Sequence, residues 1–298
     1  MKINRKTAGL LIFLIPVLII GSFVLFHRPA PLVSVVMPVY NGAAYLDRSI
    51  NSILKQSYPD FELIMIEDGS SDNSWQILQN YAAKDPRIRL LKNDRNRGIS
   101  YSRNRGNDAA RGKYIMMMDQ DDDNHPDRIL KQAAYMESHP ELTISATPSQ
   151  SGHEWFKFQS DELIKYGLFF NNNYGHPNLM VRRDFLKKNN IRYNLDYKCA
   201  NDYEWLIQIR DKGGVFGGMS EALFIYNGPN YSAEGGPCYE ESRKIMRRWS
   251  ELDIGMEQYV CNIMELILSD SKYQRMFSDS FRTTIRENRQ KLCHSLQK

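Results

Sequence analysis

Four aspartates lie within five residues, directly after an apolar stretch, at positions 119 and 121 to 123. The stretch Tyr114 to Met118 has the length and composition of a buried strand, so the carboxylates should lie where that strand leaves a sheet. Open α/β sheets bind their ligands at this edge. Because clustered carboxylates repel one another, a positive charge should lie among them, and Mg²⁺ or Mn²⁺ suits such oxygen ligands. We therefore predict a cation site at this aspartate cluster.

Two other interpretations of the cluster are open. The alternation Asp-x-Asp-x-Asp matches the first three ligands of an EF-hand loop, but Asn124 stands where that loop needs glycine and Leu130 where it needs glutamate. The cluster could also be a solvated acidic turn before a helix that starts near Pro126, because acids favour a helix N-terminus.

Strand-like and helix-like stretches alternate around the cluster. Apolar and β-branched runs predict four strands, and apolar residues at helical spacing separate them, with Ser74 as a candidate helix cap. The predicted strands cover residues 33–38, 61–66, 88–91 and 114–118. This order predicts an α/β fold, a mainly parallel sheet flanked by helices.

The carboxyl edge of such a sheet would bring Tyr40 and the pair Glu67-Asp68 next to the aspartate cluster. Two acidic loops and an aromatic side chain suit a nucleotide whose diphosphate is bound through a metal. The first turn lacks Gly-x-Gly-x-x-Gly, and the chain has no Walker lysine motif. We therefore expect the phosphates to be held by the cation rather than by a glycine-rich loop.

Several segments in this order resemble family 2 glycosyltransferases of GT-A fold, which have a Rossmann-like sheet. The first are Val-Ser-Val-Val-Met-Pro-Val-Tyr-Asn-Gly from Val33 and Phe-Glu-Leu-Ile-Met-Ile-Glu-Asp-Gly-Ser-Ser-Asp-Asn-Ser from Phe61. The others are Asn96-Arg97-Gly98, Arg103-Asn104 and Ala110-Arg111-Gly112-Lys113-Tyr114-Ile115, followed by the aspartate cluster. The resemblance covers roughly residues 33–230, which we take as the catalytic domain.

The resemblance implies a role for the residues at the donor side. Pro38 and Tyr40 would lie beside the nucleoside base, and Asp68 would accept a hydrogen bond from a uracil-like ring. Asp119 would face the ribose and diphosphate. Asp121, together with Asp122, would hold Mg²⁺ or Mn²⁺, whose Lewis acidity favours departure of the nucleoside diphosphate.

The acceptor side is predicted at Asp202. This residue stands where the family commonly has the aspartate of a Glu-Asp pair, which deprotonates the acceptor hydroxyl; here Asn201 replaces the glutamate. Asp202 could instead cap the helix that follows. Glu204 is a weaker candidate for the same role, because it faces elsewhere on the helix. His176 could contact the diphosphate or acceptor, although a single histidine beside a proline is more often structural.

The first 28 residues differ from the rest of the chain. Residues 8 to 26 are uncharged and predominantly apolar, which at about 1.5 Å per residue is enough to cross a hydrocarbon core of about 30 Å. Three basic residues precede them, so we predict a membrane anchor over residues 1–28. A cleaved signal peptide is less favoured, because the apolar run is long and residues 28 to 30 form a poor cleavage site.

The net charge of +4 is carried entirely by the anchor segment, so the remainder of the chain is neutral and nucleic acid is not an expected partner. The positive-inside rule favours a catalytic domain on the far side of the membrane, and the sequon Asn230-Tyr231-Ser232 fits a lumen. A bacterium, however, keeps nucleotide sugars in the cytoplasm, so the side of the catalytic domain stays open. The four cysteines include no Cys-x-x-Cys pair, which argues against a zinc site.

Residues 231–298 have helical character and balanced charge. Arg248-Trp249 lacks the glutamine of the Gln-x-x-Arg-Trp signature found in processive family members, so we expect one sugar to be added per encounter. Taken together, the sequence predicts an inverting, metal-dependent transferase that moves a sugar from a nucleotide donor, with a UDP-sugar favoured, to a glycan or lipid-linked hydroxyl. The alternatives are a non-catalytic nucleotide- or glycan-binding module and a nucleotidyltransferase that makes the activated sugar.

Overall fold

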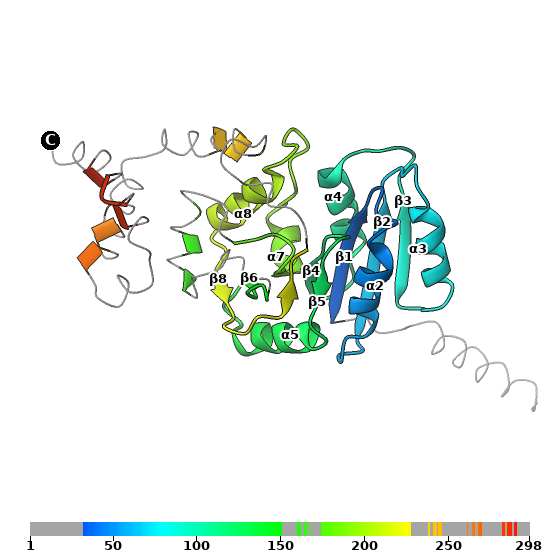
Figure 1. Cartoon of the computed structure of the whole chain (residues 1–298). Coiled ribbons are helices and arrows are strands. Elements are labelled where there is room, and N and C mark those ends of the chain that lie inside the picture. Colours follow the sequence, from blue (N-terminus) through cyan, green and yellow to red (C-terminus); the bar gives the residue numbers. More distant parts are fainter. Residues whose placement is uncertain are drawn as a thin grey trace, which may run out of the picture.

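The computed structural model describes residues 32–150 and 174–227, together with short stretches and single positions between 160 and 168 and between 238 and 290. Its centre is a seven-stranded sheet in the order β3-β2-β1-β4-β7-β6-β8 (Figure 1). The strands are β1 (Val33–Val39), β2 (Phe61–Glu67), β3 (Ile88–Lys92), β4 (Tyr114–Met117), β6 (Ile144–Ala146), β7 (Leu179–Arg182) and β8 (Phe216–Gly218). A separate two-stranded ribbon pairs β5 (Asp123–Asn124) with β9 (Phe224–Ile225).

The first half of the chain forms the predicted parallel sheet. β1 pairs in parallel with both β2 and β4, and β2 pairs in parallel with β3. Every residue of β2 and β4 is buried, as expected for apolar strands covered on both faces. Helices connect the strands: α2 (Leu46–Leu54), α3 (Ser74–Ala82) and α4 (Ile99–Ala109). The carboxyl ends of β1, β2 and β4 therefore meet at one edge, which confirms the predicted location of the acidic loops.

Two hydrophobic cores cover the two faces of the sheet, because successive strand residues point to opposite sides. Val35 packs with residues of α2, α3 and α5 (Arg128–Ser138). Val36 packs instead with residues of α7 (Arg183–Lys188) and α8 (Asn201–Asp211), including the fully buried Trp205. Since α8 carries the predicted base, this second core connects the acceptor side to the sheet that carries the donor side.

The second half of the chain differs from the prediction in one strand. Because proline belongs at strand starts and sheet edges, the sequence of residues 176 to 183 predicts an edge strand, but β7 is internal and pairs antiparallel with β4 and with β6. Pro177 precedes the strand, so its missing N–H removes no hydrogen bond from either ladder. The edge on this side is β8, which pairs in parallel with β6.

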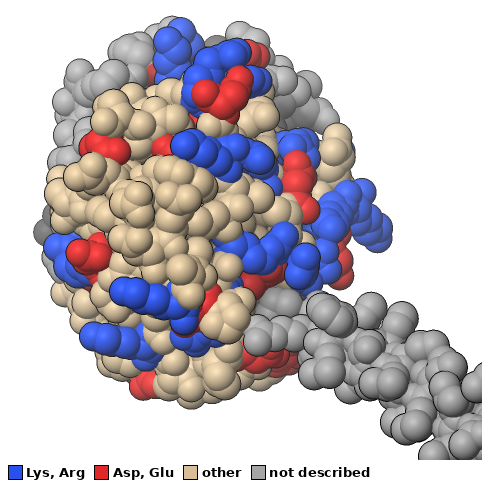
Figure 2. Space-filling model, turned by 90° about the vertical axis from the view of Figure 1, so that its right-hand side faces the viewer, with Lys and Arg blue, Asp and Glu red and all other residues tan. Residues whose placement is uncertain are grey.

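The predicted anchor and most of residues 231–298 lie outside the described part of the chain. Within the described part, no helix combines the length and the apolar composition needed to span a bilayer. The face formed by β3 and α3 carries basic side chains interspersed with acidic and uncharged ones (Figure 2).

Candidate functional site

Asp68 lies at the carboxyl end of β2 and is almost fully buried, with 3% of its surface exposed. Its Oδ1 accepts hydrogen bonds from Asn93 Nδ2 at 2.6 Å and from the Arg97 N–H at 2.8 Å, and its Oδ2 accepts one from the Gly98 N–H at 2.9 Å. These donors, all from the segment after β3, fix the orientation of the carboxylate. A carboxylate can accept about four hydrogen bonds, so Asp68 keeps the capacity to accept one from a ligand.

The turn after Asp68 requires glycine. Gly69 has a φ of +74°, and a Cβ added there would lie 2.4 Å from the Asn96 nitrogen. Only glycine adopts this conformation readily and allows the backbone of the next loop to come so close. The glycine in Glu67-Asp68-Gly69 therefore allows the loop after β2 to contact the loop after β3.

Tyr40 is the exposed aromatic residue of the site, and Gln120 holds its backbone. Gln120 Oε1 accepts from the Tyr40 N–H at 2.9 Å, while its Nε2 donates to the Tyr40 carbonyl at 3.0 Å. A Cβ at Gly42 would lie 2.4 Å from the same Oε1, so glycine is needed for this approach. The ring of Tyr40, with Pro38 two residues earlier in β1, is thus free to face a base. The role of Gln120 was not predicted from the sequence, although it is the middle residue of the Asp-x-Asp.

Ser74 has a different role from the one predicted. Asn73 occupies the N-cap of α3 without a side-chain cap, and Ser74 is the first residue of the helix, its N–H donating to Asp72 Oδ1 at 2.9 Å. The Ser74 hydroxyl accepts a hydrogen bond from the Gly42 N–H at 2.9 Å. This hydroxyl therefore joins the loops after β1 and β2.

Asp119 and Asp121 are the carboxylates best placed to share a cation. Both are half-buried, and burial followed by the negative charge of Asp119 raises the pKa of Asp121. Arg48 supports their loop by donating to the Asp121 carbonyl at 2.6 Å and by pairing with Asp123 at 3.0 Å. A bound cation would offset the repulsion that raises this pKa.

Asp122 is more deeply buried than this pair. It is fully buried, and its Oδ1 accepts from the Asn227 N–H at 3.0 Å, next to the β5–β9 ribbon. Burial, followed by the charge of Asp119, raises the pKa of Asp122 to about 8. With one oxygen on the Asn227 N–H and no exposed surface, Asp122 is the less accessible of the two candidate metal ligands.

The available donors fit Mg²⁺ or Mn²⁺. Among the described residues, no group of three or more histidine, cysteine, aspartate or glutamate side chains could hold a metal by itself. Mg²⁺ is usually bound through one or two carboxylates and the phosphates of a substrate rather than by an all-protein site. Asp121, with Asp119 beside it, would provide such a partial site.

Arg103 of α4 connects the donor side with the predicted acceptor side. Its guanidinium is buried, with Nη2 donating to Asp119 Oδ1 at 2.9 Å and Nη1 donating to Asn201 Oδ1 at 2.8 Å. Asp202 lies next to Asn201 in the first turn of α8, and its Oδ1 accepts from the Tyr203 N–H at 2.8 Å. Because Asn201 replaces the family's glutamate, Arg103 donates to an amide oxygen at this position rather than to a carboxylate. The Arg103-Asn104 motif was recognised in the sequence, but the contact between Arg103 and Asn201 joins residues 98 positions apart and was not predicted.

The charge of Arg103 also acts on Asp202. Burial raises the pKa of Asp202, and the positive charge of Arg103 is the largest opposing effect. Glu204, the other acid in this turn, accepts a hydrogen bond from Gln208 at 2.7 Å, one turn further along α8. The charges of Arg103 and Asp119 both act on Asp202, which connects this acid electrostatically to the donor side.

We expect Arg103→Gln to lower turnover by about 10- to 100-fold, as is typical when a residue that orients a ligating group is lost. Without the positive charge, the pKa of Asp202 should rise further, so the acid limb of the kcat profile should move to higher pH. Arg192→Gln, which removes an exposed ion pair with Asp108, is the control and should leave the limb in place. An unchanged acid limb in Arg103→Gln would contradict this electrostatic role.

His176 is part of the core rather than of the site. Only 4% of its surface is exposed, its Nε2 lies 2.7 Å from the Tyr193 hydroxyl, and its ring packs against Trp205. Burial, reinforced by the charge of Arg103, lowers its pKa well below the ordinary value. The structural interpretation of this histidine is therefore the better one.

Acidification should destabilise the protein through His176. The unfolded chain takes up a proton near pH 6.5, whereas the folded chain does not, so stability is lost as the pH falls below that value. The loss is about 1.4 kcal/mol per pH unit until the folded pKa is reached. Urea unfolding at pH 7 and pH 5 should show a smaller loss for His176→Gln than for the wild type. Equal losses would show that His176 titrates normally.

Residues 34–209, more than half of the chain, match the family model described as glycosyl transferase family 2. The chain belongs to this family. It is therefore a glycosyltransferase with a GT-A-like fold that uses nucleotide sugar donors, which confirms the predicted enzyme class. The chain is also 36% identical over 214 residues to the uncharacterized glycosyltransferase MJ1057 of Methanocaldococcus jannaschii, a match that covers 67% of this chain and 72% of MJ1057.

Two solved structures of glycosyltransferases share the fold. TarS of S. aureus, in a complex with UDP-GlcNAc, superposes with a TM-score of 0.63 at 22% identity. The match covers 80% of this chain and 73% of the TarS chain. The mannosyltransferase PcManGT of Pyrobaculum calidifontis, in a complex with GDP-Man and Mn²⁺, has a TM-score of 0.57 at 15% identity. The match covers 88% of this chain and 70% of the PcManGT chain. Both similarities support the GT-A-like architecture of this glycosyltransferase.

Proposed function

We propose that this glycosyltransferase inverts the anomeric centre, depends on Mg²⁺ or Mn²⁺, and transfers one sugar from a UDP-sugar to a hydroxyl of a glycan or a lipid-linked acceptor. The observation that carries the proposal is the Arg103 bridge between Asp119 and Asn201. Through it, the donor carboxylates and the predicted base Asp202 belong to a single site. One guanidinium thus connects the groups for both substrates of a transfer reaction.

On the donor side, Tyr40 offers an aromatic face for the nucleoside base, and Asp68 offers a carboxylate that can accept from an N–H on the edge of uracil. Asp121, with Asp119 beside it, would hold the cation. The bound cation would neutralise the charge that develops on the departing diphosphate. Arg103 limits the accumulated negative charge by pairing with Asp119.

On the acceptor side, Asp202 would take the proton from the attacking hydroxyl while the oxygen forms the new bond to the anomeric carbon. The bond between this carbon and the diphosphate oxygen breaks on the opposite side, so the configuration inverts. The raised pKa of Asp202, caused by burial, makes its carboxylate a better base than an exposed aspartate. The positive charge of Arg103 opposes this rise and favours the ionised form.

We also propose that residues 1–28 attach the enzyme to a membrane as a single-pass anchor, which would bring it close to lipid-linked acceptors. The structure contains a disulfide between Cys199 and Cys238. Because disulfides persist in oxidising compartments, this bond supports a catalytic domain on the side that the positive-inside rule favours. Protease protection of the domain in sealed vesicles, lost only after detergent treatment, is the expected result.

A donor screen with UDP-, GDP- and dTDP-sugars tests the proposed reaction. We expect Mn²⁺-dependent release of UDP from a UDP-sugar, and a product of inverted configuration by NMR. Binding of UDP without release from any donor would favour the non-catalytic module. Release of pyrophosphate would identify a nucleotidyltransferase.

A further inference from the structure

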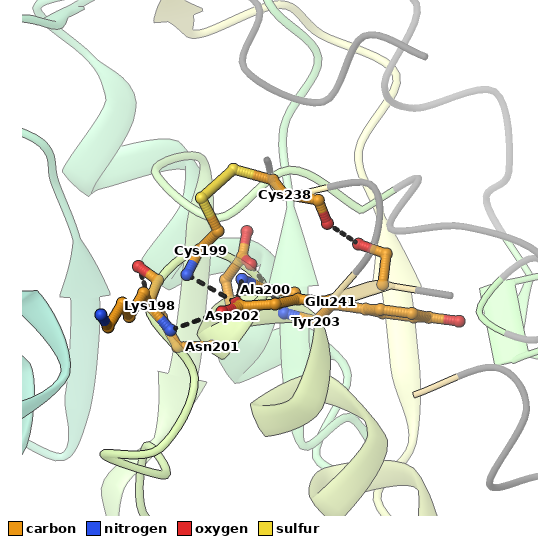
Figure 3. Close-up of a disulfide and its surroundings, with 9 residues drawn as sticks. Lys198, Cys199, Ala200, Asn201, Asp202, Tyr203, Cys238 and Glu241 are labelled. Carbon is orange, nitrogen blue, oxygen red and sulfur yellow. Dashed lines mark hydrogen bonds between the residues drawn. A yellow bond between two sulfur atoms is a disulfide. The ribbon is translucent and has the colours of Figure 1, made fainter. Parts of the chain in front are cut away.

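The segment before α8 donates three backbone N–H groups to a single carboxylate from the C-terminal part of the chain. Glu241 Oε1 accepts from the Lys198 N–H at 3.2 Å, and Oε2 accepts from the N–H groups of Cys199 and Ala200 at 2.8 and 3.0 Å (Figure 3). The first N–H groups of a helix have no backbone partner within it, and the N-cap residue Ala200 has no side chain that could accept one, although Asp202 accepts the Tyr203 N–H. Glu241 therefore supplies the acceptor from a distance of about 40 positions in the sequence.

A covalent bond connects the same two segments. Cys199 forms a disulfide with Cys238, with the two Cα atoms 4.9 Å apart. Cys238 and Glu241 lie three positions apart in the sequence, and both contact residues 198–200. The Ser242 hydroxyl donates to the Cys238 carbonyl at 2.9 Å, which strengthens this turn. The C-terminal segment thus holds residues 198–200 through a disulfide and a carboxylate together.

These contacts lie immediately before the predicted base. Ala200 is the N-cap of α8, and Asp202 lies in its first turn, so the position of residues 198–200 determines where the Asp202 carboxylate points (Figure 3). On the other side, Arg103 holds Asn201 at 2.8 Å. A general base must lie within hydrogen-bond reach of the proton it removes, and a misplacement of about 1 Å can cost about 100-fold in rate.

The charge state of Glu241 is suited to this role. Burial alone would raise its pKa, but the N–H groups of residues 200, 199 and 198 together with Lys244 outweigh burial and lower it. Glu241 is therefore an anion throughout the neutral range, and it accepts charge-assisted hydrogen bonds, which are stronger than neutral ones. Its contribution should be lost only when the pH falls through this lowered pKa.

We propose that Glu241 is a positioning residue. Together with the Cys199–Cys238 disulfide, it holds the Asp202 carboxylate in the position needed to remove the proton from the acceptor. This inference rests on the proposed assignment of Asp202 as the base. It extends the acceptor side beyond residues 34–209, the part of the chain that matches the family model. The site is accordingly incomplete without the C-terminal segment.

The test compares kcat with the donor KM in the full chain, using the UDP-sugar that the donor screen identifies. We expect Glu241→Ala to lower kcat by about tenfold, and its combination with Cys199→Ser and Cys238→Ser to lower kcat by about 100-fold. The donor KM and the binding of UDP with Mn²⁺ should stay within about twofold, because the donor residues are untouched. Glu241→Gln keeps one acceptor oxygen and should recover part of the loss. Glu221→Ala, at an exposed glutamate paired with Lys131, is the matched control and should leave kcat and the donor KM unchanged.

Hydrogen exchange gives a readout that needs no substrate. The amides of residues 198–200 should exchange faster in Glu241→Ala than in the wild type, while those of β1 and β2 stay protected. Wild-type kcat in the triple variant, with Asp202→Asn inactive, would overturn the positioning role and leave the base assignment intact. Equal losses of UDP binding and of kcat would also overturn it, because they would indicate a general structural role. Wild-type transfer by Asp202→Asn would instead refute the proposed function.

Discussion

Asp121→Asn should abolish metal-dependent donor binding and lower kcat/KM by about 10³-fold, because the cation contributes several kcal/mol to departure of the diphosphate. Asparagine has the size of aspartate but no charge. The expected loss is therefore one of cation affinity, and the free energy of unfolding should change little. Calorimetric titration of UDP in the presence of Mn²⁺ should give heat for the wild type and none for the variant. Chelation of the metal should reduce the wild type to the level of the variant.

Asp122→Asn is the comparison that separates the two adjacent carboxylates. The structure buries Asp122 and directs its Oδ1 to the Asn227 N–H, an acceptor role that an amide oxygen can fill. Because Asp122 is the less accessible of the two carboxylates, the neutral amide should preserve Mn²⁺-dependent binding of UDP. Asp184→Asn, in the exposed first turn of α7, controls for the loss of a surface charge. If Asp122→Asn lost binding and Asp121→Asn kept it, our choice of metal ligand would be wrong.

Asp202→Asn should have the opposite signature. Binding of UDP with Mn²⁺ should stay at the wild-type level, whereas transfer should fall by about 10²- to 10⁴-fold, the usual contribution of a positioned base. The amide still offers an oxygen to the Tyr203 N–H, so the first turn of α8 should keep its geometry. The rate of transfer at saturating donor and acceptor measures the loss directly. Transfer at the wild-type rate would mean that another group removes the proton.

The pH profile gives an independent view of the same residue. Burial raises the pKa of Asp202 above the ordinary carboxyl value of 3.8, so wild-type kcat should fall as the pH drops through the raised value. Glu204→Gln should preserve this limb, because Glu204 is paired with Gln208 further along the helix. If the acid limb of the kcat profile disappeared in Glu204→Gln, Glu204 rather than Asp202 would be the base.

The central sheet was predictable because its signals are local. The apolar run of β2 and the helical spacing in α2 depend only on neighbouring residues, and parallel strands must bring their carboxyl ends to one edge. This topological rule placed Tyr40, Asp68 and Asp119 together before any contact was known. The internal position of β7 was missed, because a proline before a strand is compatible with either an edge or an inner strand.

The roles of individual side chains depended on directions and distances that a linear pattern does not contain. Asp121 and Asp122 are equivalent in the sequence, yet folding leaves the former half-buried beside Asp119 and buries the latter against Asn227. Adjacent residues can face opposite environments, and a sequence motif does not specify which one turns inward.

The sequence by itself determined the family, the order of strands and helices, and the set of acids at the carboxyl edge, since these follow from local pattern and topology. Tertiary structure decided that Arg103 joins Asp119 to Asn201, that Cys199 pairs with Cys238, and that Glu241 holds the start of α8. Each of these contacts joins residues from different parts of the fold. They form only when packing brings distant segments within hydrogen-bond or covalent reach, and no periodicity in the chain encodes that approach.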